Sequence, residues 1–284
     1  MSGPPFRRVA IYGLGLIGGS IGLALKARWP GVQVMAIDRP HVVDSAIRMR
    51  VADAGGETLS LASDADLVVL AAPVLQNVAA LARLAGDLHG RLVVTDVSST
   101  KRTVTEAAAG LPERIAFVGG HPLSGAAVSG IEAARPDLFA DRPWILTGTE
   151  RVPSDVVEAL TDFVLGMRAI PRVMDAVEHD RVLAYVSHLP QLSVSALMHV
   201  VGLGAGEEGL ALAGRGLRDT TRLATSPAAT WRDIVATNGD NIASALDELI
   251  AALQHIKAAA AAAPADIDDL FVSAARWKGV LEHR

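Results

Sequence analysis

Three glycines near the amino end have the spacing G-x-G-x-x-G. Gly13, Gly15 and Gly18 follow the apolar run at residues 9–12. In a dinucleotide-binding unit the first glycine makes a tight turn, the second lets the backbone approach the pyrophosphate, and the third lets the helix pack closely on the strand. The first N–H groups of that helix would bind the phosphates. The pattern predicts a dinucleotide site formed by Gly13, Leu14, Gly15, Leu16, Ile17 and Gly18.

An acidic residue ends the next apolar run. Asp38 closes residues 32–38, at the place where a carboxylate accepts hydrogen bonds from the adenosine ribose of NAD. This carboxylate would repel the 2′-phosphate of NADP, whereas Arg39 would attract it. We therefore predict NAD, with Asp38 and Arg39 as cofactor-binding residues, and leave NADP open. Ala72 and Pro73, at the end of another apolar run, are predicted to line the same cofactor.

Transfer of a hydride to a nicotinamide needs a base beside the reacting hydroxyl. His121 lies directly after the apolar run at residues 115–120, and imidazole is the side chain best suited to accept a proton near neutral pH. Ser99 and Lys101 follow the apolar run at 91–97. Ligands bind at the carboxyl edge of a doubly wound sheet, so all three are predicted to lie at that edge. Two alternatives are a solvated loop histidine and a Ser or Thr that caps the helix predicted at 101.

A proline interrupts an apolar, helical stretch of the second half, with His188 and Gln191 beside it. Pro190 cannot donate a hydrogen bond to the carbonyl four residues earlier, so the helix is predicted to kink near His188. Such a kink with two polar side chains predicts a pocket wall that binds substrate. The alternative is a core histidine bonded to the freed carbonyl.

Two arginines stand four residues apart on one predicted helix face. Arg218 and Arg222 would repel each other there unless an anion joins them. A guanidinium is the natural bidentate partner of a carboxylate. The pair, together with Lys101, therefore predicts a small anionic substrate, and the alternative is a surface ion pair between Asp219 and Arg222.

The elements that must position these residues alternate between strands and helices. Runs rich in Val, Ile and Leu predict parallel strands covered on both faces, at residues 8–12, 32–38, 67–72, 91–97 and 115–120. Helical patterns lie between them, at 17–28, 41–49, 75–85 and 101–109. A strand at 143–148, a helix at 153–166 and a strand at 168–173 follow.

This alternation predicts an α/β fold, in which an N-terminal Rossmann-type doubly wound parallel sheet is followed by an all-helical C-terminal domain. We expect residues 1–173 to bind the dinucleotide. Strand patterns stop after about residue 174, and residues 174–284 are expected to form a helical substrate and dimerisation domain of about five or six helices.

Composition excludes several classes of protein. The chain has no cysteine and a net charge of −5, which excludes disulfides and thiolate metal sites and disfavours nucleic-acid or anionic-membrane partners. We predict no metal site. The amino end has no signal-peptide pattern, so a cytoplasmic location is expected. An uncharged run at 184–206 is long enough to raise the question of a membrane span. Its histidines, proline and serines instead favour a buried helix pair in a soluble protein.

Taken together, six motifs in this order resemble the prephenate/arogenate dehydrogenase family of tyrosine biosynthesis. They are GLGLIGGS, DVSSTK, GHPLSG, SHLPQ, RDTTRLA and WRDI with a later Asn. The resemblance covers residues 9–253. It implies NAD(P)-dependent oxidation of the ring hydroxyl of prephenate or arogenate, with loss of the ring carboxylate as carbon dioxide. It also implies a homodimer formed through the helical domain.

The resemblance assigns roles to four residues. His121 would polarise the ring hydroxyl, and Ser99 would bond near that hydroxyl and the cofactor. Arg222 would grip a substrate carboxylate, and His188 would line the substrate pocket. Trp231 and Asn238 are expected to have packing or helix-joining roles.

Two departures from the family pattern are visible. Gln191 replaces a second histidine, which leaves open whether prephenate or arogenate is preferred, and Ala126 and Ala127 stand where many relatives carry an acidic residue. One competing class is a 3-hydroxyacid dehydrogenase, which would need a helical lysine, yet no lysine lies between Lys101 and Lys257. A nonenzymatic NAD(P)-sensing regulator is another, and it would lack the histidine and arginine set.

Overall fold

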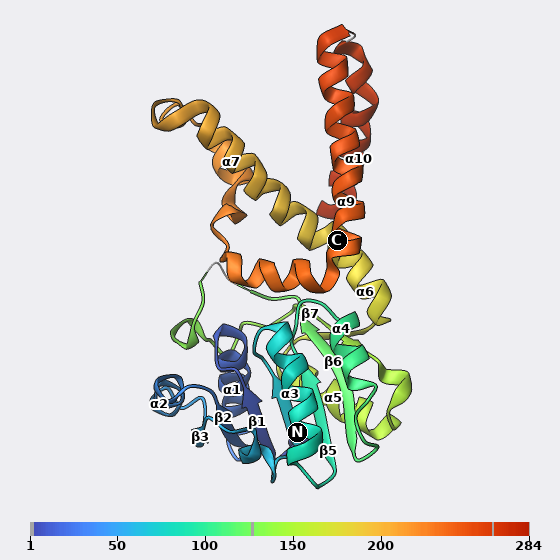
Figure 1. Ribbon diagram of the computed structural model, residues 1–284. Coiled ribbons are helices and arrows are strands. Elements are labelled where there is room, and N and C mark those ends of the chain that lie inside the picture. Colours follow the sequence, from blue (N-terminus) through green and yellow to red (C-terminus); the bar gives the residue numbers. More distant parts are fainter. Residues whose placement is uncertain (1–2, 126–127, 263, 284) are drawn as a thin grey trace.

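A single eight-stranded sheet forms the centre of the first part of the chain. The computed structural model describes residues 3–125, 128–262 and 264–283, so Ala126 and Ala127 lie outside the described residues. The sheet order is β3-β2-β1-β4-β5-β6-β7-β8 (Figure 1). Its strands are β1 (Arg8–Tyr12), β2 (Gln33–Ile37), β3 (Ala54–Gly56), β4 (Leu67–Leu70), β5 (Leu92–Asp96), β6 (Ile115–Pro122), β7 (Pro143–Thr147) and β8 (Ile170–Val173).

Helices cover both faces of this sheet, as the apolar strand runs predict. One core cluster packs Ile11 of β1 against Ile21 and Phe163, and another packs Val68 of β4 against Leu81 and Val104. The helices are α1 (Leu16–Arg28), α2 (Pro40–Arg48), α3 (Val74–Asp87), α4 (Arg102–Ala108) and α5 (Ser154–Gly166). The strand order reverses between β1 and β4, which is the place where doubly wound sheets bind ligands.

The sheet differs from the expected one at its far edge. Strand β7 runs antiparallel to β6, and β8 is parallel to β7, so the last two strands oppose the others. Between β6 and β7 the described residues contain a short 3₁₀ turn at Ile131–Ala133 but no crossover helix. Two strands joined without a crossover can pair only as antiparallel neighbours. Strand β3 was not predicted, because the sequence Ala-Gly-Gly has no strand pattern.

The residues after β8 are helical, as predicted. They form α6 (Ala176–Leu183), a π-helical turn (Ala184–His188), α7 (Leu189–Leu210), α8 (Arg215–Thr220), a 3₁₀ segment η5 (Arg222–Thr225), α9 (Ala228–Ala262) and α10 (Asp268–Glu282). In Figure 1 the first turns of α9 run across the edge of the sheet, and the rest of α9 turns away beside α10. The turn lies at Asn238, whose φ of −139° and ψ of 27° are not helical.

The expectation of a buried helix pair at 184–206 was wrong. Residues Ala176–Leu210 run as one helix, only 6% of whose most apolar stretch is buried. By length and composition alone this helix would be able to cross a membrane. An apolar composition shows that a face needs cover, but it does not show whether the same chain supplies that cover.

Candidate active site

The glycine-rich turn has the geometry that a dinucleotide requires. Gly13 has a φ of +91°, and a Cβ there would lie 2.5 Å from the backbone N of Ala72. A Cβ on Gly18 would lie 2.0 Å from the carbonyl O of Gly13. A Cβ on Gly15 would meet no described atom within 4 Å. Gly13 and Gly18 are thus required by the protein itself, whereas Gly15 faces open space of the kind that a pyrophosphate would fill.

The groups around this turn also fit a dinucleotide. Helix α1 begins at Leu16 with no side-chain cap and no acidic residue in its first turn, so its first N–H groups are available to an anion. Asp38 lies at the end of β2, where its carboxylate accepts hydrogen bonds from the N–H groups of Leu14 and Arg39, each at 2.7 Å. Pro73 precedes α3 at the same edge as Gly13. The sequence-predicted cofactor residues are therefore brought together.

These contrasting glycines give a matched pair of variants. We expect Gly15→Ala to raise the dissociation constant for NAD by at least about tenfold, equivalent to ~1.4 kcal/mol, because its methyl group would occupy the open space. The thermal midpoint should stay unchanged. Gly18→Ala should instead lower the free energy of unfolding by about 1–3 kcal/mol through overpacking. Fluorescence titration with NADH and thermal melting separate the two effects, and equal NAD affinity of Gly15→Ala and wild type would contradict this assignment.

Lys101, which the sequence predicts to bind substrate, is instead part of a buried ion pair. Lys101 is fully buried, and its Nζ donates to Asp96 Oδ2 at 2.5 Å and to the carbonyl of Gly120 at 2.7 Å. Asp96 also accepts the N–H of Gly120 at 2.9 Å. Burial lowers the pKa of Lys101, while Asp96 opposes that shift. The buried pair therefore clamps the strand residue that precedes His121, and Lys101 does not present its charge to a substrate.

The start of α4 is not capped as the sequence alternative supposed. None of the described serines or threonines of this loop caps the helix by a side-chain hydrogen bond. The carboxylate of Asp180 on α6 instead accepts the N–H groups of Lys101 and Arg102, at 2.7 and 2.9 Å. Ser99 is half-buried in this loop, and among the described residues its hydroxyl has no hydrogen-bond partner. That hydroxyl is thus available to a ligand.

His121 is buried near the end of β6 and contacts a second histidine. Its Nδ1 lies 2.8 Å from Nε2 of His179, and Nδ1 of His179 lies 2.8 Å from Oδ1 of Asp180. Burial, followed by the charges of His179, Lys101 and His188, lowers the pKa of His121 well below its usual value. A neutral imidazole at this position can act as a base at neutral pH.

His188 lies in the π-helical turn that precedes Pro190, where the sequence predicted a kink. The amide Nδ2 of Asn238 donates to the carbonyl of Asp180 at 2.8 Å and lies 3.2 Å from Nδ1 of His188. Trp231 packs edge-on against the His188 ring. Asn238 thus joins α6, the π turn and the bend of α9.

Burial makes protein stability depend on the protonation of His188. Burial lowers its pKa to about 4, with Asp180 opposing the shift and His179 adding to it. The unfolded chain takes up the proton near its ordinary value of 6.5, so the unfolded state binds more protons between these values and stability falls as the pH falls. We expect this residue to cost about 2 kcal/mol by pH 5. Urea unfolding from pH 7 to 4.5 measures the loss, which should be smaller by that amount in His188→Asn. An identical pH dependence of stability in the wild type and in His188→Asn would rule out this contribution of His188.

Gln191 also departs from its predicted role. It is buried, and its amide Nε2 donates to the carbonyl of Leu223 at 2.8 Å and to Ser195 Oγ at 3.2 Å. Its Oε1 accepts a hydrogen bond from Ser226 at 2.9 Å. The side chain is used within the protein, so it holds the η5 segment against α7 and does not face a substrate.

The two predicted substrate arginines are exposed. Arg218 lies in α8 and Arg222 in η5. Within the described ranges neither guanidinium has a hydrogen-bond or ion-pair partner, and the alternative pair between Asp219 and Arg222 does not form. Among the described residues neither arginine makes a hydrogen bond, ion pair or ring contact with His121 or His188, which the structure brings together with His179. Ser99 lies in the loop after β5, the strand that pairs with β6.

The sequence reasoning missed His179 and Asp180. They lie in the segment Glu178-His179-Asp180, which has the polar composition of an exposed helix face. Both are fully buried. The visible signal was a histidine next to an acidic residue early in the helical part, which is weak because charged runs are usually solvated.

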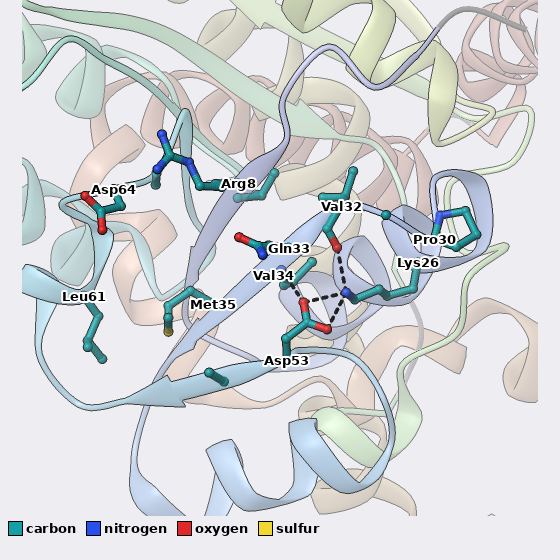
Figure 2. A pocket seen from close by; sticks show the side chains of 14 residues that line it. Arg8, Lys26, Pro30, Val32, Gln33, Val34, Met35, Asp53, Leu61 and Asp64 are labelled. Atoms are coloured by element: carbon teal, nitrogen blue, oxygen red, sulfur yellow. Dashed lines mark hydrogen bonds and ion pairs between the residues drawn. The ribbon is translucent and has the colours of Figure 1, made fainter.

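A large pocket lies at the opposite edge of the sheet. It has a volume of about 640 Å³ and opens at the amino ends of β1 and β2. Figure 2 shows its charged wall, where Lys26 is paired with Asp53 and also donates to the carbonyl of Val32. Arg8 is paired with Asp66. Both cations, Lys26 and Arg8, are already paired with carboxylates. None of the predicted cofactor, catalytic or substrate residues lines this pocket.

Comparison with known proteins agrees with this arrangement. Residues 21–172 match the family described as the nucleotide-binding domain of prephenate dehydrogenase, and residues 175–273 match its dimerization domain. A structure of prephenate dehydrogenase from A. aeolicus in complex with hydroxyphenyl propionate and NAD⁺ superimposes with a TM-score of 0.87 at 26% identity. It covers 99% of this chain and 98% of that one.

Two relatives by sequence support the same family. The chain is 36% identical over 255 residues to the prephenate dehydrogenase of Bacillus subtilis (strain 168), covering 88% of this chain and 69% of that protein. It is 33% identical over 270 residues to the cyclohexadienyl dehydrogenase of Zymomonas mobilis, covering 92% of this chain and 91% of that protein. With both domain families matched in order along its length, the chain belongs to the prephenate dehydrogenase family.

Proposed function

We propose that this chain oxidises prephenate to 4-hydroxyphenylpyruvate and carbon dioxide with NAD, in tyrosine biosynthesis. The observation that carries the proposal is the buried, neutral His121 at the carboxyl edge of the sheet that also holds the glycine-rich turn. The names of the Bacillus and A. aeolicus relatives support the substrate and the cofactor. The match to a dinucleotide-binding geometry around Gly15 supports the cofactor independently.

Because the reaction creates an aromatic ring, the protein has mainly to orient the substrate and to stabilise the charge that develops on it. NAD, when bound, accepts the hydride from the carbinol carbon. The bond between the ring and its carboxylate breaks, its electron pair enters the ring, and the ring becomes aromatic. The hydroxyl oxygen ends as a phenol, so no net proton is released. His121 accepts a hydrogen bond from the hydroxyl and stabilises the positive charge that develops there, and orientation supplies much of the remaining acceleration.

Four other residues are proposed to position the substrate. Ser99 would bond to the reacting hydroxyl or the nicotinamide, because its hydroxyl is free at the same edge. His188 would donate a hydrogen bond from Nε2, since its Nδ1 faces the amide of Asn238. Arg222, with Arg218 nearby, would bind a substrate carboxylate bidentately, because both guanidinium groups are exposed and unpaired within the described ranges.

Asp38 supports NAD over NADP. Its carboxylate is held by two backbone N–H groups at the end of β2, and Arg39 lies 3.7 Å from it as an exposed ion pair. A 2′-phosphate would have to approach a fixed negative charge. Arg39 is partly neutralised by the same carboxylate, which weakens its attraction for that phosphate.

A second candidate is oxidation of arogenate to tyrosine, alone or together with prephenate. The relationship to a cyclohexadienyl dehydrogenase favours it. Gln191 does not decide between the two substrates, because its amide is bonded to α7 and η5.

We also propose that the protein is a cytoplasmic homodimer. Each chain would be divided at about residue 173 into a dinucleotide-binding domain and a helical domain. The support is the end of β8 at Val173, the match to a dimerization domain, and large exposed apolar side chains on α7 and α10. These side chains are Val200, Leu203, Phe271, Trp277 and Leu281. Sedimentation should give twice the mass of the chain, and a monomer at micromolar concentration would contradict the dimer.

One assay tests the function. The absorbance of reduced cofactor is followed with prephenate and with arogenate, each with NAD and with NADP. We expect the highest kcat/KM with prephenate and NAD. Higher activity with arogenate would establish the second candidate. No activity with any pair would overturn the proposal in favour of a 3-hydroxyacid dehydrogenase or a nonenzymatic NAD(P)-sensing regulator.

A further inference from the structure

A chain of three buried side chains connects the sheet to the helical part. His121 comes from β6, whereas His179 and Asp180 come from α6. The two contacts are both 2.8 Å long, and the two histidine rings meet edge to face with centroids 5.1 Å apart. His179 and Asp180 are fully buried, so water does not compete for these contacts.

The direction of each hydrogen bond follows from the charge of Asp180. Burial by itself would raise the pKa of Asp180, but hydrogen bonds from His179 and from the N–H groups of Arg102 and Lys101 outweigh it and lower that pKa. The carboxylate is therefore ionised at neutral pH and can only accept. Nδ1 of His179 must carry the proton that it donates to Asp180.

The tautomer of the second ring then fixes that of the first. Burial lowers the pKa of His179 below its usual value, and the charge of Lys101 adds to this shift, while Asp180 opposes it without outweighing it. The ring is neutral at pH 7, so with Nδ1 protonated its Nε2 has a lone pair and accepts. Nδ1 of His121 must donate to it, which leaves Nε2 of His121 without a proton. The lone pair on Nε2 can then accept a hydrogen bond from the substrate hydroxyl, as a general base requires.

We propose that His179 and Asp180 are positioning residues that set the tautomer of His121 and stabilise its charge during the reaction. The inference rests on the proposed role of His121. As the substrate O–H bond lengthens toward Nε2 of His121, the Nδ1 proton shifts toward His179 and the Nδ1 proton of His179 shifts toward Asp180. When the ring becomes aromatic the protons return, and the phenol keeps its own.

The other charged groups around His121 do not replace this relay. The charges of Lys101 and His188 act on His121 from the end of the β5 loop and from the π turn, and Asp96 of β5 acts on His179. Lys101 is paired with Asp96, so these two charges largely cancel, and His188 is neutral. Asp180 is the carboxylate that is connected to His121 through hydrogen bonds.

The experiment compares His179→Gln with wild type. A glutamine retains an acceptor for Nδ1 of His121, but its amide, unlike an imidazole, cannot take up a proton at one atom and release one to Asp180 from another. We expect kcat/KM for prephenate to fall by at least about tenfold, within the range of a general base. Less stabilisation of protonated His121 lowers its pKa, so the acidic limb of the kcat/KM profile should move to lower pH. The matched control is His89→Gln, which replaces an exposed histidine in the loop between α3 and β5.

A second measurement does not depend on activity. Nitrogen-15 NMR of the imidazoles should show Nδ1 protonated and Nε2 unprotonated in His121, with the signals assigned from the His121→Asn and His179→Gln variants. The Nε2-protonated form of His121 would overturn the relay even if the enzyme is active. An unchanged acidic limb with nearly wild-type kcat/KM in folded His179→Gln would also overturn it. Correct tautomers in a protein with no dehydrogenase activity would support the relay and reject the proposed function.

Discussion

We expect His121→Asn to lower kcat by about 10²–10⁴-fold, the usual contribution of a placed general base. Asparagine keeps a polar side chain of similar reach, but it cannot accept a proton at neutral pH. His121 lies on the sheet next to His179, and within the described part of the chain no hydrogen bond or ring contact joins it to the glycine-rich turn. The affinity for NAD should therefore remain at the wild-type value, and kcat and kcat/KM should fall together.

Steady-state kinetics with prephenate and a fluorescence titration with NADH test this expectation. His89→Asn serves as a control for the general effect of replacing a histidine. Turnover close to that of wild type in His121→Asn would reject His121 as the base. A parallel loss of NADH affinity would show that the substitution disturbed the cofactor site instead.

We expect Lys101→Met to lower the free energy of unfolding by about 3–5 kcal/mol, the cost of leaving one partner of a buried ion pair uncompensated. Methionine nearly fills the same volume, but Asp96 would keep a buried charge, and the carbonyl of Gly120 would lose a donor. Because Gly120 precedes His121, turnover should fall as well.

Urea unfolding and kinetics distinguish this structural role from substrate binding. If Lys101 bound a substrate carboxylate, its loss would raise KM and leave stability unchanged. Lys278→Met, which removes an exposed lysine of α10, is the matched control and should leave the unfolding midpoint nearly unchanged. Adding Asp96→Asn to Lys101→Met should recover part of the lost stability, because it removes the unpaired charge.

The sequence by itself determined the features that depend on local pattern. Apolar periodicity located every strand of the sheet except β3, and the helices that cover it, to within a few residues, because strands buried on both faces must be apolar throughout. The glycine spacing predicted the turn between β1 and α1, because Gly13 and Gly18 have no room for a side chain. The order of the motifs was sufficient to indicate the family.

Only the tertiary structure decided how the polar side chains are used. Lys101 became half of a buried clamp, and Gln191 became a support for η5. His179 and Asp180, which read as an exposed helix face, became the partners of His121. The antiparallel direction of β7 and the exposure of α7 likewise became visible only in the tertiary structure. The physical reason is that burial and hydrogen-bond partners come from residues distant in sequence, such as His121 and His179, which are 58 positions apart. The spacing of residues within a single segment cannot predict such long-range contacts.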